Sequence, residues 1–316
     1  MAEPRICAVI PVFNNARYID QALGSIAMQR RPVDEVIVVD DASSDDSAAI
    51  AERWRAILPI QVMRLEKNQG CWAARNAAIE ATDADLIALL DSDDIWLPDH
   101  LAVMLATYRE RPGVVTANPL MWIEEKALAT KGWNDRRPVP PAHQQMDQLL
   151  LGNYVFVATL FRRDLCVELG GFRHFTIGCE DWDLWLRMAA LGTEIVRPDE
   201  STMLYRLRGD SLSANDALVS SEIEVLESFK RDHDDPAWAR VADVAITRRR
   251  AKLQLLGSYE AAARGASTDA RRRALRSLRH SDRDGLLAGV AMTLAPKYAV
   301  SRRQALRRDP ARAVHR

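Results

Sequence analysis

Apolar residues in the first part of the chain follow two alternating patterns. Short, almost continuous runs of Val, Ile and Leu predict strands, and apolar positions three or four residues apart predict helices between them. The expected strands span residues 6–12, 35–39, 60–65, 85–90 and 114–116, and the expected helices span residues 16–28, 47–57, 71–81 and 97–109. Because parallel strands buried on both faces have such continuous apolar runs, we expect an α/β fold with a mostly parallel sheet flanked by helices.

The second half of the chain changes character. We expect a strand at residues 154–161, a helix at 181–191 and a short extended segment at 205–208, whereas residues 131–143 have the composition of an irregular loop. From about residue 216 nearly all positions fit helices. The sequence therefore predicts a domain at residues 1–215 and an α-helical C-terminal region at residues 216–316.

Charge is distributed unevenly between these regions. The net charge of −1 gives no electrostatic reason to expect a nucleic-acid partner. Residues 237–316, however, hold 19 Lys and Arg against 6 Asp and Glu. This basic tail is expected to dock on anionic lipid headgroups, to form a solvated face, or to form a homodimer. The apolar stretch 285–296 fits either interfacial contact or a core helix.

Cysteine use and hydropathy indicate a cytoplasmic protein. The spacing of the four cysteines matches neither a metal site nor a disulfide framework, so we expect reduced thiols. The first strand begins within about five residues of the N-terminus, which leaves no room for a signal peptide. No apolar run approaches the ~20 residues that span a bilayer. Any membrane contact is therefore expected to be peripheral, at the inner face.

Polar residues follow each of the first four expected strands. These residues are Phe13-Asn14-Asn15, Asp40-Asp41 with Ser43, Lys67-Asn68 with Gly70, and Asp91-Ser92-Asp93-Asp94. Because ligands bind open parallel sheets at the carboxyl ends of the strands, we expect a nucleotide pocket there. The glycines of a dinucleotide fingerprint and the lysine of a phosphate loop are missing, which disfavours a dehydrogenase and a P-loop NTPase.

The acidic cluster at residues 91–94 is the strongest chemical signal. Carboxylates at Asp91 and Asp93 suit a hard cation, Mg²⁺ or Mn²⁺, that keeps open positions for phosphate oxygens. The alternative is that the cluster caps the helix that follows. One carboxylate suffices for a cap, and three in four residues repel one another unless a positive group lies among them. We therefore expect Asp93 and then Asp91 to bind metal, and Asp94 to be the cap.

Three further candidates have a structural alternative each. Asp41 suits a hydrogen bond to a pyrimidine ring N–H, or a turn or helix cap. Arg75 suits a diphosphate or ribose contact, or a surface salt bridge with Asp85 or Glu80. Asp181, in the first turn of an otherwise apolar helix face, suits a general base, or a charge favoured by the helix dipole.

Five motifs occur in a fixed order along the chain. They are residues 8–15 (AVIPVFNN), 39–43 (VDDAS), 68–76 (from NQG to ARN), 90–94 (LDSDD) and 180–183 (EDWD). Together they resemble family 2 glycosyltransferases of the GT-A fold, which is Rossmann-like, over about residues 5–213. The resemblance implies an inverting transfer from a nucleotide diphosphate-sugar, UDP-linked, to a hydroxyl of a glycan, lipid-linked or small-molecule acceptor. It also implies a role in polysaccharide biosynthesis.

The resemblance assigns roles on the nucleotide side of the site. Pro11 and Phe13 would line the nucleoside pocket, Asp41 would hold the base, and Arg75 would lie near the nucleotide.

The resemblance assigns the remaining roles to the reaction. Asp91 and Asp93 would form the DxD motif for Mn²⁺ or Mg²⁺, and Asp181 would be the catalytic base. Arg208 stands where the family often has histidine; an arginine cannot ligate a cation but can pair with the diphosphate.

Two other functions share parts of this pattern. A nucleotidyltransferase that makes nucleotide-sugars needs a loop rich in Gly and Lys near the N-terminus, which is missing. A non-catalytic nucleotide-sugar-binding protein is disfavoured because every expected site carboxylate is present.

Overall fold

The computed structural model describes residues 3–122, 138–208, 216–278, 280–281, 283–296, 299–301 and 303. The chain forms two compact units: one comprises residues 1–149, 153–174 and 180–206, and the other residues 150–152, 175–179 and 207–316. Residues 131–137 of the expected loop, and residues 209–213 at the end of the family resemblance, lie outside the described residues.

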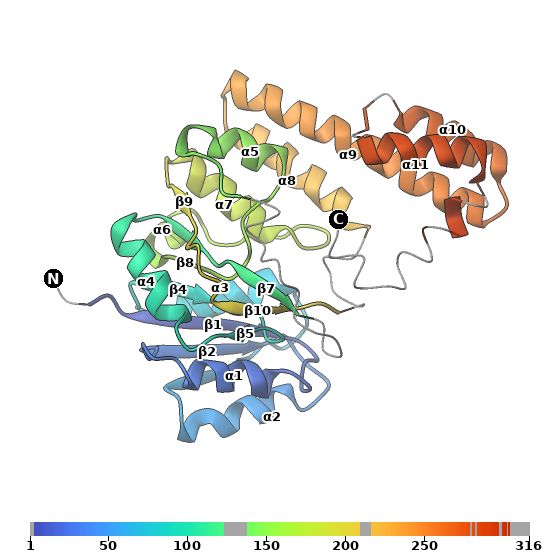
Figure 1. The fold of residues 1–316 in the computed structure, drawn as a ribbon. Helices are drawn as coiled ribbons and strands as arrows, with labels where there is room; N and C mark the ends of the chain where they lie inside the picture. The colour runs from blue at the N-terminus through green and yellow to red at the C-terminus, as the bar shows by residue number, and fades with distance from the viewer. Residues whose placement is uncertain are drawn as a thin grey trace. The chain divides into compact units, whose positions relative to one another are not determined.

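A mixed sheet forms the centre of the first unit (Figure 1). Its described strands are β1 (Ile6–Val12), β2 (Glu35–Asp40), β3 (Ile60–Arg64), β4 (Leu86–Leu89), β6 (Val114–Thr116), β8 (Thr159–Arg162) and β9 (Ile195–Val196), in the order β3-β2-β1-β4-β8-β6-β9. β1 is parallel to both β2 and β4, β2 is parallel to β3, and β6 is parallel to β9. Only β8 runs antiparallel to its neighbours, β4 and β6, among these described strands. The predicted mostly parallel sheet is confirmed.

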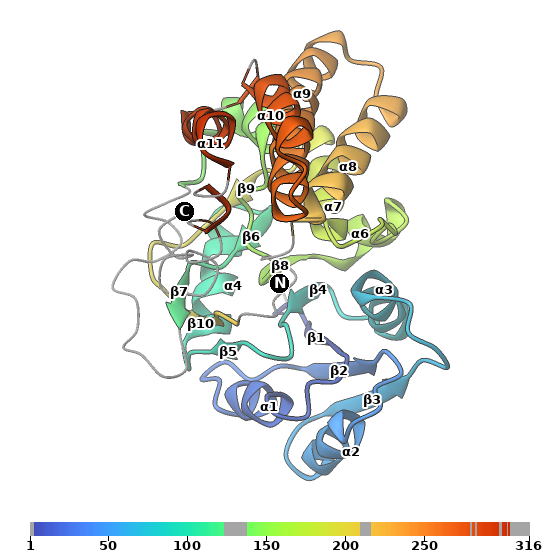
Figure 2. The same cartoon turned by 90° about the vertical axis from the view of Figure 1, so that its right-hand side faces the viewer.

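Helices cover both faces of this sheet (Figure 2). One face carries α1 (Ile19–Ala27), α2 (Ser47–Glu52) and α4 (His100–Glu110), and the other carries α3 (Cys71–Ala81), α6 (Arg163–Glu168) and α7 (Glu180–Ala190). Alternate residues of β1, such as Ile6 and Ile10, pack with Leu23 of α1 in one apolar core. Phe161 of β8 packs edge-on against Trp185 of α7 on the opposite face. Burial on both faces explains why the strands are apolar throughout.

A smaller sheet lies beside the first. β10 (Met203–Arg206) pairs with β5 (Ile95–Trp96) on one side and with β7 (Pro119–Trp122) on the other. The hydrophobic pattern did not predict β5, β7 or β9, because two to four residues are too few to show a period of two. The pairing is important for the site, since β10 lies directly beside the residues that follow the acidic cluster.

Several expected boundaries differ from the structure. The strand expected at 154–161 begins only at Thr159, and the helix expected at 97–109 begins at His100. The helix expected at 47–57 ends at Glu52 and continues as a 3-10 turn, Arg53–Ala56. α5 (Gln145–Leu151), α6 and a 3-10 turn at Ala142–Gln144 were not expected.

The described part of the second unit is mainly helical. It contains α8 (Leu218–Asp232), α9 (Pro236–Ala263), α10 (Ser267–Ser277) and α11 (Arg283–Leu294). The side chain of Asp235 accepts hydrogen bonds from the backbone N–H groups of Ala237 and Trp238, and Pro236 is the first residue of α9. This is a strong helix start. Across the described residues, no helix has both the length and the hydropathy needed to cross a bilayer.

A glycine turn after α6 joins α3 to the rest of the first unit. The side chain of Asn76 accepts from the backbone N–H of Phe172 and donates to its carbonyl, both at 2.8 Å. Gly170 and Gly171 both have positive φ, at 78° and 71°. A Cβ on Gly171 would lie 2.4 Å from Asn76 Oδ1, whereas a Cβ on Gly170 would meet nothing within 4 Å.

We therefore predict that Gly171→Ala destabilises the protein more than Gly170→Ala. Both substitutions place an L-residue in the left-handed region, at a cost of about 1–2 kcal/mol. Only Gly171→Ala also displaces Asn76, which adds about 1–3 kcal/mol. Urea unfolding followed by circular dichroism measures the difference. Equal losses of stability in the two variants would show that Asn76 moves aside freely.

Candidate active site

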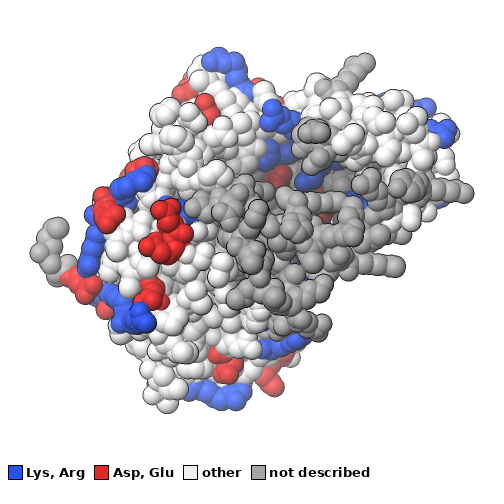
Figure 3. Space-filling model, viewed as in Figure 1, with Lys and Arg blue, Asp and Glu red and all other residues white. Residues whose placement is uncertain are grey.

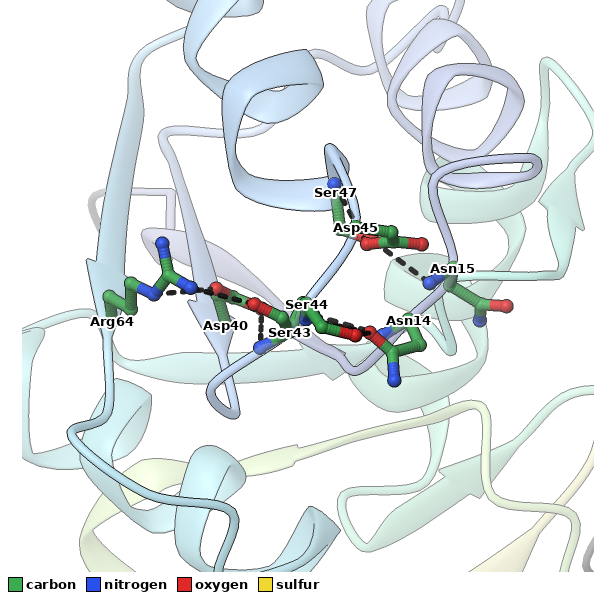
Figure 4. A network of polar contacts seen from close by, with 8 residues as sticks. All are labelled: Asn14, Asn15, Asp40, Ser43, Ser44, Asp45, Ser47 and Arg64. Atoms are coloured by element: carbon green, nitrogen blue, oxygen red, sulfur yellow. Dashed lines mark hydrogen bonds and ion pairs between the residues drawn. The ribbon is translucent and has the colours of Figure 1, made fainter.

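Hydrogen bonds join the loops that follow β1 and β2. The backbone N–H of Asn14 donates to Ser43 Oγ at 2.9 Å, and the Asn14 side chain accepts from the backbone N–H of Ser44 at 2.8 Å (Figure 4). Asn14 and Ala42 both have positive φ, which non-glycine residues adopt only when their surroundings hold them there. These bonds fix the two loops at the carboxyl edge of the sheet.

Asp41 connects this edge to α3. Its buried carboxylate accepts from the backbone N–H groups of Gln69 at 2.8 Å and Gly70 at 2.7 Å. Gly70 has a φ of 98° and immediately precedes α3. The alternative role of a local turn belongs to the neighbouring Asp40, which accepts from the backbone N–H of Ser43. Asp41 thus fixes the start of the helix that carries Arg75.

Arg75 is a buried link between two acidic segments. Its guanidinium donates to Asp91 at 2.8 Å and to Glu180 at 2.7 Å, and the side chain is 3% exposed. The expected alternative, a surface salt bridge with Asp85 or Glu80, is wrong. Asp91 follows β4 and Glu180 begins α7, so Arg75 joins the acidic cluster to the segment that contains Asp181.

The acidic cluster itself is a tight turn. The backbone N–H of Asp94 donates to the carbonyl of Asp91 at 3.0 Å. Asp94 is buried, and its Oδ1 accepts from the backbone N–H of Arg206. The prediction that Asp94 caps the next helix is wrong, because α4 begins after Asp99 and Asp94 bonds to β10 instead. Burial, together with repulsion from Asp93 and Asp91, raises the pKa of Asp94 well above its usual range.

Arg206, to which the sequence assigned no individual role, holds this turn from the side of β10. Its Nε donates to the Asp93 carbonyl at 2.8 Å, and a terminal N–H donates to Gln21 at 2.6 Å. The guanidinium lies 4.5 Å from the ring centre of Tyr18 and 4.2 Å from that of Trp122. Arg206 is buried, so its planar group is held on every side.

These arginines change the argument for a metal. Two guanidinium groups supply positive charge at the cluster, and a raised pKa favours neutral Asp94, so repulsion alone no longer requires a cation. Within the described residues, no three His, Cys, Asp or Glu side chains are grouped as a metal site. Asp91 and Asp93 nevertheless remain partly exposed. Mg²⁺ and Mn²⁺ bind through one or two carboxylates when phosphate oxygens complete the shell, and this donor set fits that case.

Asp181 lies in the first turn of α7. Its Oδ1 accepts from the backbone N–H of Trp182 at 2.7 Å, and Asn153 approaches Oδ2 at 3.5 Å. Burial and repulsion from Glu180 raise the pKa of Asp181 to about 7, although the charge of Arg75 acts in the opposite direction. A carboxylate with this pKa can accept a proton from a bound hydroxyl near neutral pH.

The remaining expected residues occupy three different settings. Pro11 is buried within β1, where it pairs with Val39. Phe13, two residues further on, is 48% exposed, which is unusual for a large apolar side chain. Arg208 follows β10 and belongs to the second unit. Its expected pairing with a diphosphate stays a prediction.

The fold matches solved glycosyltransferases. The structure of TarS from S. aureus in complex with UDP-GlcNAc superposes with a TM-score of 0.64 and 18% identity, covering 86% of this chain and 81% of that one. The mannosyltransferase PcManGT from Pyrobaculum calidifontis, in complex with GDP-Man and Mn²⁺, gives a TM-score of 0.62 and 20% identity, over 98% and 87% of the two chains. The sheet and its acidic edge therefore define a GT-A fold.

Sequence comparisons identify the family. The model of "Glycosyl transferase family 2" matches residues 7–170. The uncharacterized glycosyltransferase YwdF of Bacillus subtilis is 30% identical over 72% of this chain and 84% of its own. The amylovoran biosynthesis glycosyltransferase AmsE of Erwinia amylovora is 27% identical over 66% and 78%. The chain belongs to glycosyltransferase family 2. The family match ends before Asp181.

We predict that Arg206 cannot be replaced by another cation. Arg206→Met leaves the Asp93 carbonyl and the Gln21 side chain without their donor and should lower the free energy of unfolding by about 1–3 kcal/mol for each buried acceptor. Arg206→Lys should recover little of this loss, because an ammonium cannot stack as a plane between Tyr18 and Trp122 while donating to both the Asp93 carbonyl and Gln21. Chemical denaturation measures both variants. Wild-type stability of Arg206→Lys would show that charge alone is sufficient.

Proposed function

We propose that this glycosyltransferase transfers a sugar, with inversion, from a nucleotide diphosphate-sugar to an acceptor hydroxyl. The observation that carries the proposal is the double ion pair of Arg75, which joins Asp91 after β4 to Glu180 at the start of α7. One side chain thereby connects the carboxylate turn, which suits a cation that binds the diphosphate, to the segment whose carboxylate Asp181 suits a general base.

In the proposed reaction Asp181 accepts the proton of the acceptor hydroxyl. The oxygen attacks the anomeric carbon of the donor from the face opposite the diphosphate. The bond between that carbon and the diphosphate oxygen breaks, its electron pair stays with the leaving nucleoside diphosphate, and the configuration inverts. The pKa of about 7 favours this role, since a base works best near the operating pH.

The nucleotide is proposed to bind at the carboxyl ends of β1 and β2. A carboxylate has about four acceptor positions, so Asp41 can accept from a base N–H in addition to the two backbone N–H groups it already binds. The exposed ring of Phe13 would stack on the base, and the backbone at Pro11 would line the pocket. Arg208 would pair with the diphosphate.

We propose that Asp93 and Asp91 hold a divalent cation, Mn²⁺ or Mg²⁺. Bound there with the donor, such a cation supplies Lewis-acid stabilisation of the leaving diphosphate. Support comes from the carboxylate donor set and from the Mn²⁺ in the PcManGT complex.

The donor and acceptor are proposed from chemistry and from relatives. UDP-sugars are the first donors to test; the neighbours were solved with UDP-GlcNAc and with GDP-Man. Relatives include proteins named for the biosynthesis of amylovoran, succinoglycan and teichuronic acid. We propose a saccharide acceptor, a glycan or lipid-linked intermediate rather than a small molecule, in polysaccharide biosynthesis in the cytoplasm. Residues 1–215 would form the catalytic domain and 216–316 a basic helical region.

We predict that Asp93→Asn weakens metal-dependent binding of nucleoside diphosphate by at least about tenfold, because one charged oxygen ligand is lost. Isothermal titration calorimetry with UDP and GDP, with and without Mn²⁺, measures the effect. Asp99→Asn makes the same chemical change at an exposed carboxylate that pairs with Arg30, and should leave affinity unchanged. Wild-type affinity of Asp93→Asn in Mn²⁺ would exclude this residue as a ligand.

We predict an acidic limb in the pH profile of kcat/KM. Only ionised Asp181 can accept a proton, so activity should fall as pH drops through about 7. The profile is obtained from initial rates of sugar transfer between pH 5 and pH 9, with a nucleotide-sugar that the protein binds as donor. Release of nucleoside diphosphate is measured. Asp181→Asn should lose about 10²–10⁴-fold in turnover and show no such limb.

The control for this prediction is donor binding. Asp181→Asn should retain wild-type affinity for nucleoside diphosphate, and Asp147→Asn, at an exposed position of α5, should retain activity. Normal turnover by Asp181→Asn would assign the base to another residue.

A further inference from the structure

The helix α11 is apolar on two opposite sides. Met292 and Gly289 face the interior of the second unit: Met292 is fully buried, and a Cβ on Gly289 would lie 2.7 Å from Leu278. The opposite side exposes a stripe at positions i, i+1, i+4 and i+8, made of Leu286, Leu287, Val290 and Leu294. Leu287 is 63% exposed and Leu294 74% exposed. A helix that is apolar all round is normally covered on every side.

The neighbouring helix α10 adds positive charge to the same part of the molecule. Arg271, Arg272 and Arg276 are exposed, and none of the three forms an ion pair with another residue in the described ranges. By contrast, Arg273 pairs with Asp269. Leu275, between the exposed arginines, is itself 53% exposed. Figure 3 shows basic side chains (Lys or Arg) among uncharged ones over the end of the second unit that carries α10 and α11 in Figure 1.

The combination points to a lipid surface. α11 has 12 residues, far fewer than the ~20 that span a bilayer, so its apolar stripe can enter only the interface. Arginines beside such a stripe attract anionic headgroups. A two-fold dimer through this surface would instead bring the exposed arginines of two copies together, and like charges at an interface are unfavourable.

We propose that α10 and α11 form a membrane-docking surface for anionic phospholipid. The leucine stripe of α11 enters the headgroup boundary, and the arginines of α10 contact lipid phosphates. This inference does not depend on the proposed transfer reaction, because binding to vesicles is measured without donor or acceptor.

The test is co-sedimentation of the full chain with vesicles of phosphatidylglycerol and phosphatidylcholine, and with phosphatidylcholine alone. We expect binding only to the anionic vesicles. Binding should weaken with salt, because the Debye length falls from about 30 Å at 0.01 M to about 8 Å at 0.15 M. Absence of binding at low salt, or equal binding to neutral vesicles, would overturn the proposal.

Two variants separate the contributions. Combined replacement of Arg271, Arg272 and Arg276 by Gln should weaken binding about a hundredfold, since each arginine near an anionic surface contributes roughly fivefold. Combined Leu287→Asp and Leu294→Asp should weaken it at least about tenfold by removing buried apolar area. All five side chains are exposed, so the fold should persist; circular dichroism and Tm check this.

Matched controls lie on the first unit. Replacement of Arg53, Arg109 and Arg162 by Gln removes the same charge from exposed positions, and Ile57→Asp alters a side chain that is 66% exposed. Both should bind vesicles like the wild type. If the controls lose binding equally, net charge explains the effect and the proposal fails. If the leucine variant instead converts a dimer to a monomer in light scattering and leaves vesicle binding unchanged, the stripe is a subunit interface.

Discussion

The double ion pair of Arg75 is the interaction on which the site depends. The guanidinium is buried and supplies the positive charge between two carboxylates, so its loss would leave Asp91 and Glu180 without their cation. Its position is fixed through α3, whose start is held by Asp41. Segments that follow three different strands thus meet at one cation. The charge of Arg75 also lowers the pKa of Asp181, against the effects of burial and of Glu180. The same arginine therefore influences both the position of the site segments and the protonation of the proposed base.

Arg206 places a second positive charge beside the acidic turn at residues 91–94. Three carboxylates within one turn cannot all be charged and dry unless cations or protons compensate them. The backbone N–H of Arg206 donates to Asp94 Oδ1 and its Nε donates to the Asp93 carbonyl, while the carboxylates of Asp91 and Asp93 are partly exposed. The turn is therefore held from the side of β10 by bonds to Asp94 and to a backbone carbonyl, and the proposed cation ligands Asp91 and Asp93 stay partly exposed.

The sequence predicted long elements well and long-range contacts poorly. β1 and α3 have the bounds that their apolar patterns predicted, because these elements are long enough to show a period. Asp41, Asp91 and Asp93 were identifiable as candidate site residues because they follow parallel strands whose carboxyl ends lie at one edge of the sheet. The pairing of Arg75 with Glu180 and that of Asp94 with Arg206 were not, because these partners lie far along the chain and depend on the packing of α7 and on the pairing of β5 with β10. Arg206 had no individual role assigned from the sequence, and only its burial and contacts reveal that it holds the acidic turn.

The antiparallel strand β8 has a consequence for how the protein is assembled during synthesis. Among the described strands, β6 and β9 join the sheet only through β8, which pairs with β4 more than seventy residues earlier in the chain. Contacts of such separation form slowly, because a long loop must close first. On the ribosome, β1 to β4 can pair before β8 has been synthesised, whereas β6 can join the sheet only afterwards. Glu180 follows β8, so of the two ion-pair partners of Arg75 only Asp91 has been synthesised while β1 to β4 pair, and the link from α3 to α7 forms last.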